Sequence, residues 1–388
     1  MKKRRILWFI LWLLSLAAIT IYGGVIGYTW FFGALLMPVI SASYLLYVYI
    51  RFLVYQKIDT RNIVCGQSVP YYFILQNNDF TVYAGVQVKL FSDFSFVENI
   101  PDQTVYRIYP GEKYRFDTRL TCKYRGEYDV GVSEISLSDF FGLFRLTYRM
   151  PSVIHALVVP KIVPLSDLKS LRNSNLSAEQ LFEYEKTEPD VLVRSYIEGD
   201  PPKRIHWKAT AVSGEIKTRL YTGSAKKRML IFTDFERIQE KDAVRIPLES
   251  KLLECVIALL YYFASHHSQT QLVWLGRELC SRNVAYLESF DQAYHELSAL
   301  SFQEKRSFDL LLQECERARI KQEDGIIFWV VHELSELLMH KAEDMTQSGN
   351  MLIVYVVTDA DISAYYKQIN TRLHLIRVGV EQNVEEVL

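Results

Sequence analysis

The N-terminal segment from Ile6 to Ile50 contains no charged residue. A helix needs about 20 apolar residues to cross the hydrocarbon core of a bilayer, so this segment has room for two crossings. The glycines that begin at Gly23 mark the turn between them. We therefore predict a membrane anchor over residues 1–57, with transmembrane helices near residues 6–22 and 29–50.

Basic residues flank this apolar segment on both sides. Lys2 to Arg5 precede the first predicted span, Arg51, Lys57 and Arg61 follow the second, and the connecting turn carries no charge. By the positive-inside rule we expect a multi-pass protein of the plasma membrane, with both termini in the cytoplasm. A cleavable signal peptide ending near Ala17-Ala18 is the alternative. The second apolar stretch that follows directly favours two spans.

The composition of the chain argues against several classes of protein. Its five cysteines are odd in number and form no C-x-x-C pair, so nothing indicates a disulfide scaffold or a zinc site. The formal net charge of −1 gives no overall attraction to nucleic acid. The sequence has no G-x-S-x-G nucleophile motif and no Walker phosphate loop. We expect a protein that is not an enzyme, with no catalytic residue and no cofactor.

Residues 60–160 have an apolar pattern of period two. Val82, Ala84, Val86 and Val88 face one way, as in half-buried strands, and turn signals such as Pro110-Gly111 separate such segments. The pattern predicts an all-β domain, an antiparallel immunoglobulin-like sandwich of about seven strands.

Residues 223–388 alternate short buried β segments with longer helical ones, which is typical of a mostly parallel sheet with helices on both faces. The predicted strands are Arg228–Phe232, Gln271–Leu275, Gly325–Val331, Met351–Val357 and His374–Val378. The predicted helices are Pro247–His266, Ser289–Ala299, Ser307–Ile320 and Leu334–Thr346. Ligands of such sheets gather at the carboxyl ends of the strands, where Asp234, His332 and Asp359 stand.

The connector, residues 161–222, contains a basic stretch from Leu192 to Arg219. A helix that starts at Asp200, where two prolines follow, and stops near Gly214 is the preferred interpretation. A strand is the alternative, because apolar and basic residues alternate around Trp207. In both cases we expect Trp207 to point inward. The cations at the rim form either a solvated face or a partner surface, and a single tryptophan is a weak platform for nucleic acid.

Two runs in this stretch resemble the hallmark of a known family, the bacterial proteins with domain of unknown function 58. Their matching residues are Arg194, Tyr196, Gly199 and Asp200, followed by Arg204, Ile205, Trp207 and Lys208. Upstream, Tyr124–Tyr128, Asp139–Phe144 and Val159-Pro160 look like further landmarks of that family.

The resemblance implies a membrane-anchored protein whose C-terminal part is similar to a von Willebrand factor type A domain, a Rossmann-like α/β fold. Such proteins are typically encoded beside a MoxR-type AAA+ ATPase and a transglutaminase-like membrane protein. The expected function is that of a scaffold or adaptor that acts with these two partners and the lipid bilayer, with no nucleic acid.

In type A domains the first strand normally ends in Asp-x-Ser-x-Ser, whose oxygens hold Mg²⁺. Here the corresponding residues are Asp234, Glu236 and Ile238, so both hydroxyls are missing, and Arg237 adds a positive charge. We therefore expect no bound metal and a capping or hydrogen-bonding role for Asp234. The alternative is a divalent-metal-dependent ligand-binding protein, in which Asp234, Glu236 and Asp359 supply the ligands.

Overall fold

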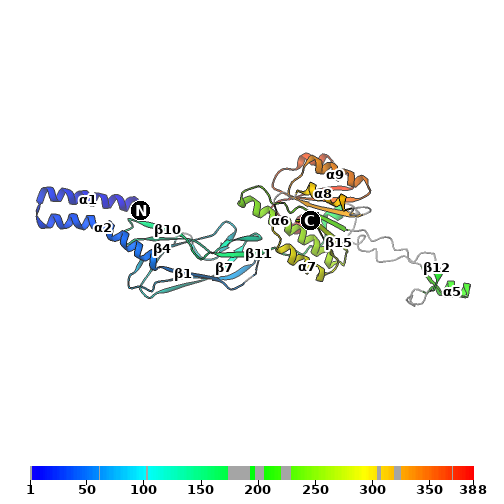
Figure 1. Ribbon diagram of the computed structural model, residues 1–388, viewed down its shortest axis with the longest axis horizontal. Helices are drawn as coiled ribbons and strands as arrows, with labels where there is room; N and C mark the ends of the chain where they lie inside the picture. Colours follow the sequence, from blue (N-terminus) through cyan, green and yellow to red (C-terminus); the bar gives the residue numbers. More distant parts are fainter. Residues whose placement is uncertain are drawn as a thin grey trace. The chain divides into compact units, whose positions relative to one another are not determined.

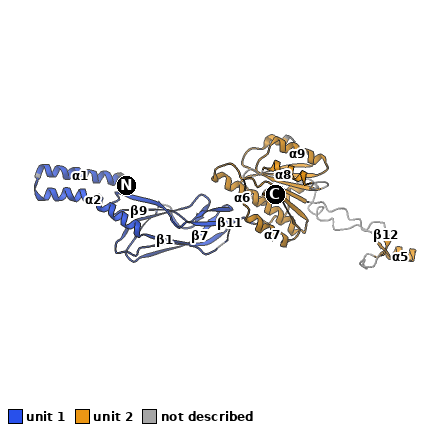
Figure 2. Ribbon diagram, in the orientation of Figure 1, with its two compact units in different colours: residues 1–161 blue, residues 162–388 orange. Residues whose placement is uncertain are grey.

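The computed structural model divides the chain into two compact units, residues 1–161 and 162–388 (Figure 2). It describes residues 2–60, 62–101, 104–173, 193–196, 205–219, 229–303, 307–318, 325–368 and 370–388.

The first unit begins with two helices, α1 (Lys2–Tyr22) and α2 (Gly24–Arg51), which lie side by side (Figure 1). Gly23 and Gly24 make the turn between them with φ of 55° and 74°, which glycine adopts without a steric penalty. Both helices are long and apolar enough to cross a membrane. The two predicted N-terminal apolar helices are thus confirmed.

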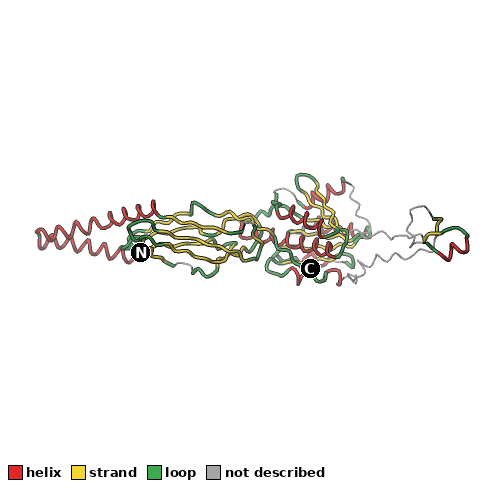
Figure 3. Tube along the Cα trace, turned by 90° about the horizontal axis from the view of Figure 1, so that it is seen from below, coloured by secondary structure: helices red, strands yellow, loops and turns green. Residues whose placement is uncertain are grey.

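Three sheets follow the helices and extend from the end of α2 (Figure 3). Two of them are antiparallel, with the orders β1-β3-β7-β5 and β10-β9-β4-β6, and the third has the order β2-β11-β8. Their strands are β1 (Leu53–Ile58), β2 (Ile63–Val64), β3 (Ser68–Gln76), β4 (Tyr83–Leu90), β5 (Ser95–Val97), β6 (Val105–Ile108), β7 (Lys113–Cys122), β8 (Gly126–Val130), β9 (Val132–Ser138), β10 (Arg145–Arg149) and β11 (Ile154–Val159). The prediction of an all-β domain holds, with more strands than the seven or so expected.

The period-two pattern builds the core of this unit. In β3, alternate residues from Val69 to Leu75 are buried, and they pack with inward residues of β4, β7 and β9. Leu45 and Val48 of α2, together with Phe52, belong to the same hydrophobic cluster. The last turns of α2 are therefore part of the β core.

The second unit contains a six-stranded sheet with the order β16-β15-β14-β17-β18-β19. All neighbouring pairs are parallel except β15 and β16. The strands are β14 (Met229–Thr233), β15 (Thr270–Leu275), β16 (Leu279–Val284), β17 (Ile326–Val331), β18 (Met351–Val357) and β19 (Leu373–Val378). The predicted α/β organisation is confirmed, and β16 is an edge strand that the sequence analysis missed.

Helices cover both faces of this sheet (Figure 1). One face packs against α6 (Asp242–Ser265) and α7 (Leu287–Ser298), the other against α8 (Phe308–Arg317) and α9 (Glu336–Gln347). Short elements complete the unit: α3 (Lys169–Asn173), the 3₁₀ helix η3 (Ser363–Gln368) and α10 (Val384–Val387). Because both faces are covered, every residue of β14 and β17 is buried.

Helix α6 starts five residues before the predicted Pro247, which lies inside the helix. Arg245 explains the longer first turns, since its guanidinium bonds Asp242 at 2.8 Å and Glu249 at 3.1 Å. These pairs lie at the helical spacings of three and four residues.

Candidate functional site

The carboxyl ends of β14 and β17 define the candidate site. From β14 the chain continues to β15 on one side, whereas from β17 it continues to β18 on the other. The sheet therefore has its topological switch point between β14 and β17, where open α/β sheets bind ligands. Asp234 follows β14 and His332 follows β17.

Asp234 and His332 form a buried ion pair at this point. Oδ2 of Asp234 lies 2.6 Å from Nδ1 of His332, and the two side chains are 4% and 15% exposed. Oδ1 of Asp234 accepts a hydrogen bond from the backbone N–H of Glu236 at 2.9 Å. The carboxylate thus has a partner on each oxygen, in line with the expected hydrogen-bonding role of Asp234.

The contact between Asp234 and His332 changes the pKa values of two side chains, those of His332 and Glu236. Burial by itself lowers the pKa of His332, but the hydrogen bond and the negative charge of Asp234 outweigh burial and raise that pKa above its usual value. Burial and the charge of Asp234 also raise the pKa of the Glu236 carboxyl. His332 therefore keeps its second ring proton to a higher pH than an ordinary histidine does.

The other acidic residues at this edge of the sheet have local partners. Oδ1 of Asp359 accepts the N–H of Val380 at 3.0 Å. Asp361 accepts the N–H of Ser363 at 2.9 Å at the start of η3. Within the described part of the chain, no group of three or more His, Cys, Asp or Glu side chains is arranged to hold a metal ion.

The described part of the basic stretch from Leu192 to Arg219 forms a small hairpin with a helix. Strands β12 (Val193–Ser195) and β13 (Lys217–Arg219) pair antiparallel, and α5 (Trp207–Ser213) lies between them in sequence. The helix ends at Gly214, as predicted. Gly214 has the left-handed conformation there. Nδ1 of His206 caps its start by accepting the N–H of Ala209, a role that the sequence analysis gave to Asp200.

The side chain of Trp207 is 70% exposed, so the prediction that it points inward is wrong. The cause is local: α5 is one short helix of which no residue is buried. Lys208 is exposed beside it, whereas Ile205 forms a bridge to Thr218. Arg194 belongs to β12 and Tyr196 follows it. Gly199, Asp200 and Arg204 lie outside the described residues.

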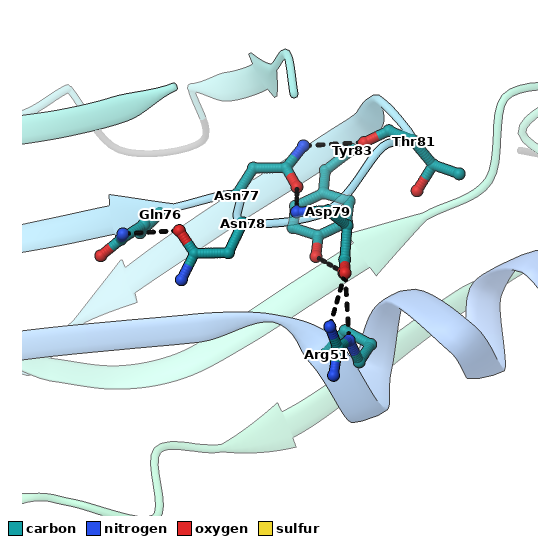
Figure 4. A network of polar contacts seen from close by, with 7 residues as sticks. All are labelled: Arg51, Gln76, Asn77, Asn78, Asp79, Thr81 and Tyr83. Carbon is teal, nitrogen blue, oxygen red and sulfur yellow. Dashed lines mark hydrogen bonds and ion pairs between the residues drawn. The ribbon is translucent and has the colours of Figure 1, made fainter. Parts of the chain in front are cut away.

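We call the strands of the first unit, residues 53–159, the β unit, and the second unit the α/β unit. Two further polar sites, both missed by the sequence analysis, join α2 to the β unit. Figure 4 shows the first, in which Nε and Nη2 of Arg51 bond Oδ1 of Asp79 at 3.0 and 2.9 Å. The hydroxyl of Tyr83 donates to the other oxygen of Asp79. These hydrogen bonds hold the pKa of Asp79 below its usual value. Asp79 is buried, so its charge needs these partners.

The second join centres on Asp139, which is 4% exposed. Its carboxylate accepts backbone N–H groups of Phe141, Leu143 and Phe144, and also the hydroxyl of Ser41 in α2. This explains physically why Asp139–Phe144 forms a compact loop: one carboxylate satisfies three N–H groups of its own turn.

Comparison with known proteins assigns no family. No family model and no curated protein matches the sequence. Among solved structures, the GH20 exo-β-N-acetylglucosaminidase from Vibrio harveyi in complex with N-acetylglucosamine aligns at 8% identity with a TM-score of 0.18. The alignment covers 84% of this chain and 81% of that chain. A similarity of this size carries no argument about fold or activity.

Proposed function

We propose that this protein is a membrane-anchored, non-enzymatic scaffold of the plasma membrane. Helices α1 and α2 would cross the bilayer, and the β unit and the α/β unit would lie in the cytoplasm. The length and hydropathy of the two helices support this, as do Arg4 and Arg5 at the start of α1 and Arg51 at the end of α2.

As part of the same proposal, the β unit is an immunoglobulin-like sandwich and the α/β unit a von Willebrand factor type A-like domain. If the strands of the six-stranded sheet are numbered along the chain, they lie in the order 3-2-1-4-5-6 of doubly wound α/β sheets, with the third strand reversed. An aspartate at the end of its first strand, Asp234, also supports this assignment.

The partners that we propose are a MoxR-type AAA+ ATPase and a transglutaminase-like membrane protein, as the resemblance to proteins with domain of unknown function 58 implies. The observation that carries a scaffold role is the exposure of large apolar side chains on α5. Trp207 and Val212 are 70% and 86% exposed there, and Lys208 is exposed next to Trp207. Tryptophan is among the residues that most often dominate the energy of protein interfaces.

Copurification of the full-length protein with the ATPase tests this role. We expect Trp207→Ala to reduce the amount of ATPase recovered and to leave thermal unfolding unchanged, because the side chain packs little against its own chain. Tyr366→Ala is the matched control, since it removes another exposed aromatic ring of the second unit. Equal recovery with the wild type and Trp207→Ala would remove α5 from the interface.

Ligand binding through a divalent cation at Asp234, Glu236 and Asp359 has less support. Asp234 is paired with His332, and imidazole is a poor ligand for Mg²⁺. Titration calorimetry with Mg²⁺ and Mn²⁺ compares the two functions directly. Heat of binding that disappears in Asp234→Ala would establish the metal-dependent alternative.

A further inference from the structure

The two polar joins hold two loops of the β unit against the membrane-proximal turns of α2. The first is the β3–β4 loop, residues 77–82, and the second is the β9–β10 loop, residues 139–144. We call these two loops together the collar. The ring of Phe80 in the first lies 6.1 Å from that of Tyr47, and the ring of Phe140 in the second lies 4.6 Å from that of Tyr44. The collar therefore contacts successive turns of α2.

The β3–β4 loop is held on three sides, as Figure 4 shows for most of its contacts. Nδ2 of Asn77 donates to the carbonyl of Thr81 at 2.8 Å, and Oδ1 of Asn77 accepts the N–H of Asp79 at 3.0 Å. Asp79 in turn bonds Arg51 and Tyr83. Next to these buried polar groups the ring of Phe80 is 82% exposed. A well-ordered loop thus presents one large apolar side chain outward.

The β9–β10 loop is fastened in a comparable way and contacts the start of α1. Nε of Arg5 donates to the carbonyl of Leu143 at 2.6 Å. Gly142 has a φ of 70°, and a Cβ there would meet Arg4 at 2.5 Å. Phe140 and Phe141, at the tip of the loop, remain about half exposed.

An apolar groove of about 390 Å³ lies between α2 and the β3–β4 loop. It is lined by Val39, Ile40, Ser43, Tyr44, Tyr47, Phe80 and Thr81. Most of its wall comes from α2, so the groove is continuous with the surface of a helix that we place in the bilayer. Its occupant must therefore match the chemistry of the lipid around that helix.

Exposed apolar residues beside the groove on α2 bear on how far the lipid reaches. Leu46 and Ile50 are 58% and 68% exposed and flank Tyr47 in sequence. Since a helix rises about 1.5 Å per residue, these side chains stand within about 5 Å of the height of Tyr47. Hydrocarbon that covers Leu46 and Ile50 thus also reaches the height of Phe80.

We propose that the collar is embedded in the membrane interface and that the groove holds an acyl chain of a bilayer phospholipid, with Phe80 as its outer wall. This inference rests on the proposed membrane anchoring. Aromatic rings are favoured at the boundary between headgroups and acyl chains, and Arg4 and Arg5 lie at the collar where anionic headgroups attract cations. The β unit would then be seated in the bilayer surface as well as attached to it.

Fluorescence quenching by brominated acyl chains tests the proposal in the full-length protein. An environment-sensitive dye is attached at Phe80→Cys or Phe141→Cys, and the protein is inserted into phosphatidylcholine–phosphatidylglycerol vesicles with or without brominated chains. The background carries Cys65→Ser and Cys280→Ser. Cys122, Cys255 and Cys315 are buried, so they escape labelling. We expect loss of emission at both positions in brominated vesicles.

Two further positions make the outcomes distinct. Leu36→Cys, half exposed in the middle of α2, reports membrane insertion itself. Phe96→Cys is the matched control, because Phe96 is a 56% exposed phenylalanine on β5, which pairs with the end of β7 opposite to the collar. Quenching at 36 without quenching at 80 and 141 overturns the collar and leaves the anchor. No quenching at 36 overturns both, and quenching at 96 overturns a contact confined to the collar.

A third variant tests the groove. Ser43→Phe, which fills the groove from α2, should reduce the quenching of the dye at 80 and leave that at 141 unchanged. Undiminished quenching at 80 would mean that the loop meets lipid without an acyl chain in the groove, and would overturn that part of the proposal.

Discussion

Asp234 and His332 form a charged pair at the carboxyl ends of two neighbouring strands. The carboxylate stands where the fold offers a ligand site, and the neighbouring strand supplies an imidazole 2.6 Å away. With both side chains buried, each charge depends on the other, because an isolated buried charge is strongly disfavoured. The pair thus joins two central strands, whatever else binds there.

We expect His332→Gln to destabilise the α/β unit by about 3 kcal/mol at pH 6, the size typical for breaking a buried pair. The pKa of His332 is raised in the folded state, so the contribution is complete below the pKa of an unfolded histidine, about 6.5, and is lost as the pH rises through the folded value. Denaturant unfolding of the wild type and the variant over a pH series measures this.

His340→Gln is the control for this series, since His340 is an exposed histidine on α9. The difference in unfolding free energy between the wild type and His332→Gln should become smaller as the pH rises. A gap for His332→Gln that is independent of pH would contradict the charged pair.

The cysteines allow a second prediction. Burial raises the pKa of the Cys255 and Cys315 thiols to about 12, and Cys122 is also buried, whereas Cys65 and Cys280 are half-buried. The thiolate is the reactive form, so we expect a thiol reagent at pH 8 to modify two thiols in the folded protein and five after denaturation. Cys280→Ser should lower the folded count by one, and no change would contradict the assignment.

At the scale of elements, the turn between β8 and β9 depends on a glycine. Gly131 has a φ of 85°, and a Cβ there would lie 2.5 Å from Oε1 of Gln56 and 2.9 Å from the hydroxyl of Tyr71. Gln56 bonds Tyr71 and the N–H of Val132, so it has little freedom to move. The turn and the core of β3 are therefore coupled.

Gly131→Ala should destabilise the β unit more than Gly111→Ala does. Gly111 has a similar φ of 77° but open space around it, so both variants carry the backbone strain of about 1–2 kcal/mol and only the first adds a clash. Overpacking of this kind costs about 1–3 kcal/mol. Thermal unfolding of both variants gives the comparison, and equal melting temperatures would show that Gln56 adapts.

The elements also show which patterns a sequence reveals. Strands β14, β17 and β18 of the α/β sheet are apolar on both faces, and the strands of the first unit have the period-two pattern, so both kinds can be recognised in the sequence. Strand β16 was missed because its middle residues, Ser281 to Asn283, are polar and exposed at the sheet edge, so it has no continuous apolar run. Trp207 was misjudged because alternation of side chains says nothing about whether another element covers them.

The sequence also reveals some of the candidate sites and not others. Asp234 and His332 were found because strand ends of a parallel sheet share an edge, which the pattern alone determines. The joins at Asp79 and Asp139 bring together residues far apart in sequence, 28 positions in one case and 98 in the other. Their partners belong to a helix that hydropathy describes only as a membrane span.

At the scale of the whole molecule, the proposed orientation in the membrane is open to a direct test. With both termini in the cytoplasm, a reporter that is active only in the periplasm should be inactive when fused after Leu388. The same reporter inserted at Gly24, in the turn between α1 and α2, should be active. The reverse pattern would contradict the proposed topology.

Only Phe52 separates the end of α2 at Arg51 from the start of β1 at Leu53, and Phe52 itself is buried in the β core. A helix and a sheet connected in this way cannot swivel independently, as two bodies on a flexible tether would. A force applied to the far end of the β unit would therefore act on the helix pair as torque. In a bilayer, the first unit would work as a lever, with the helix pair as the arm that lies among the lipids.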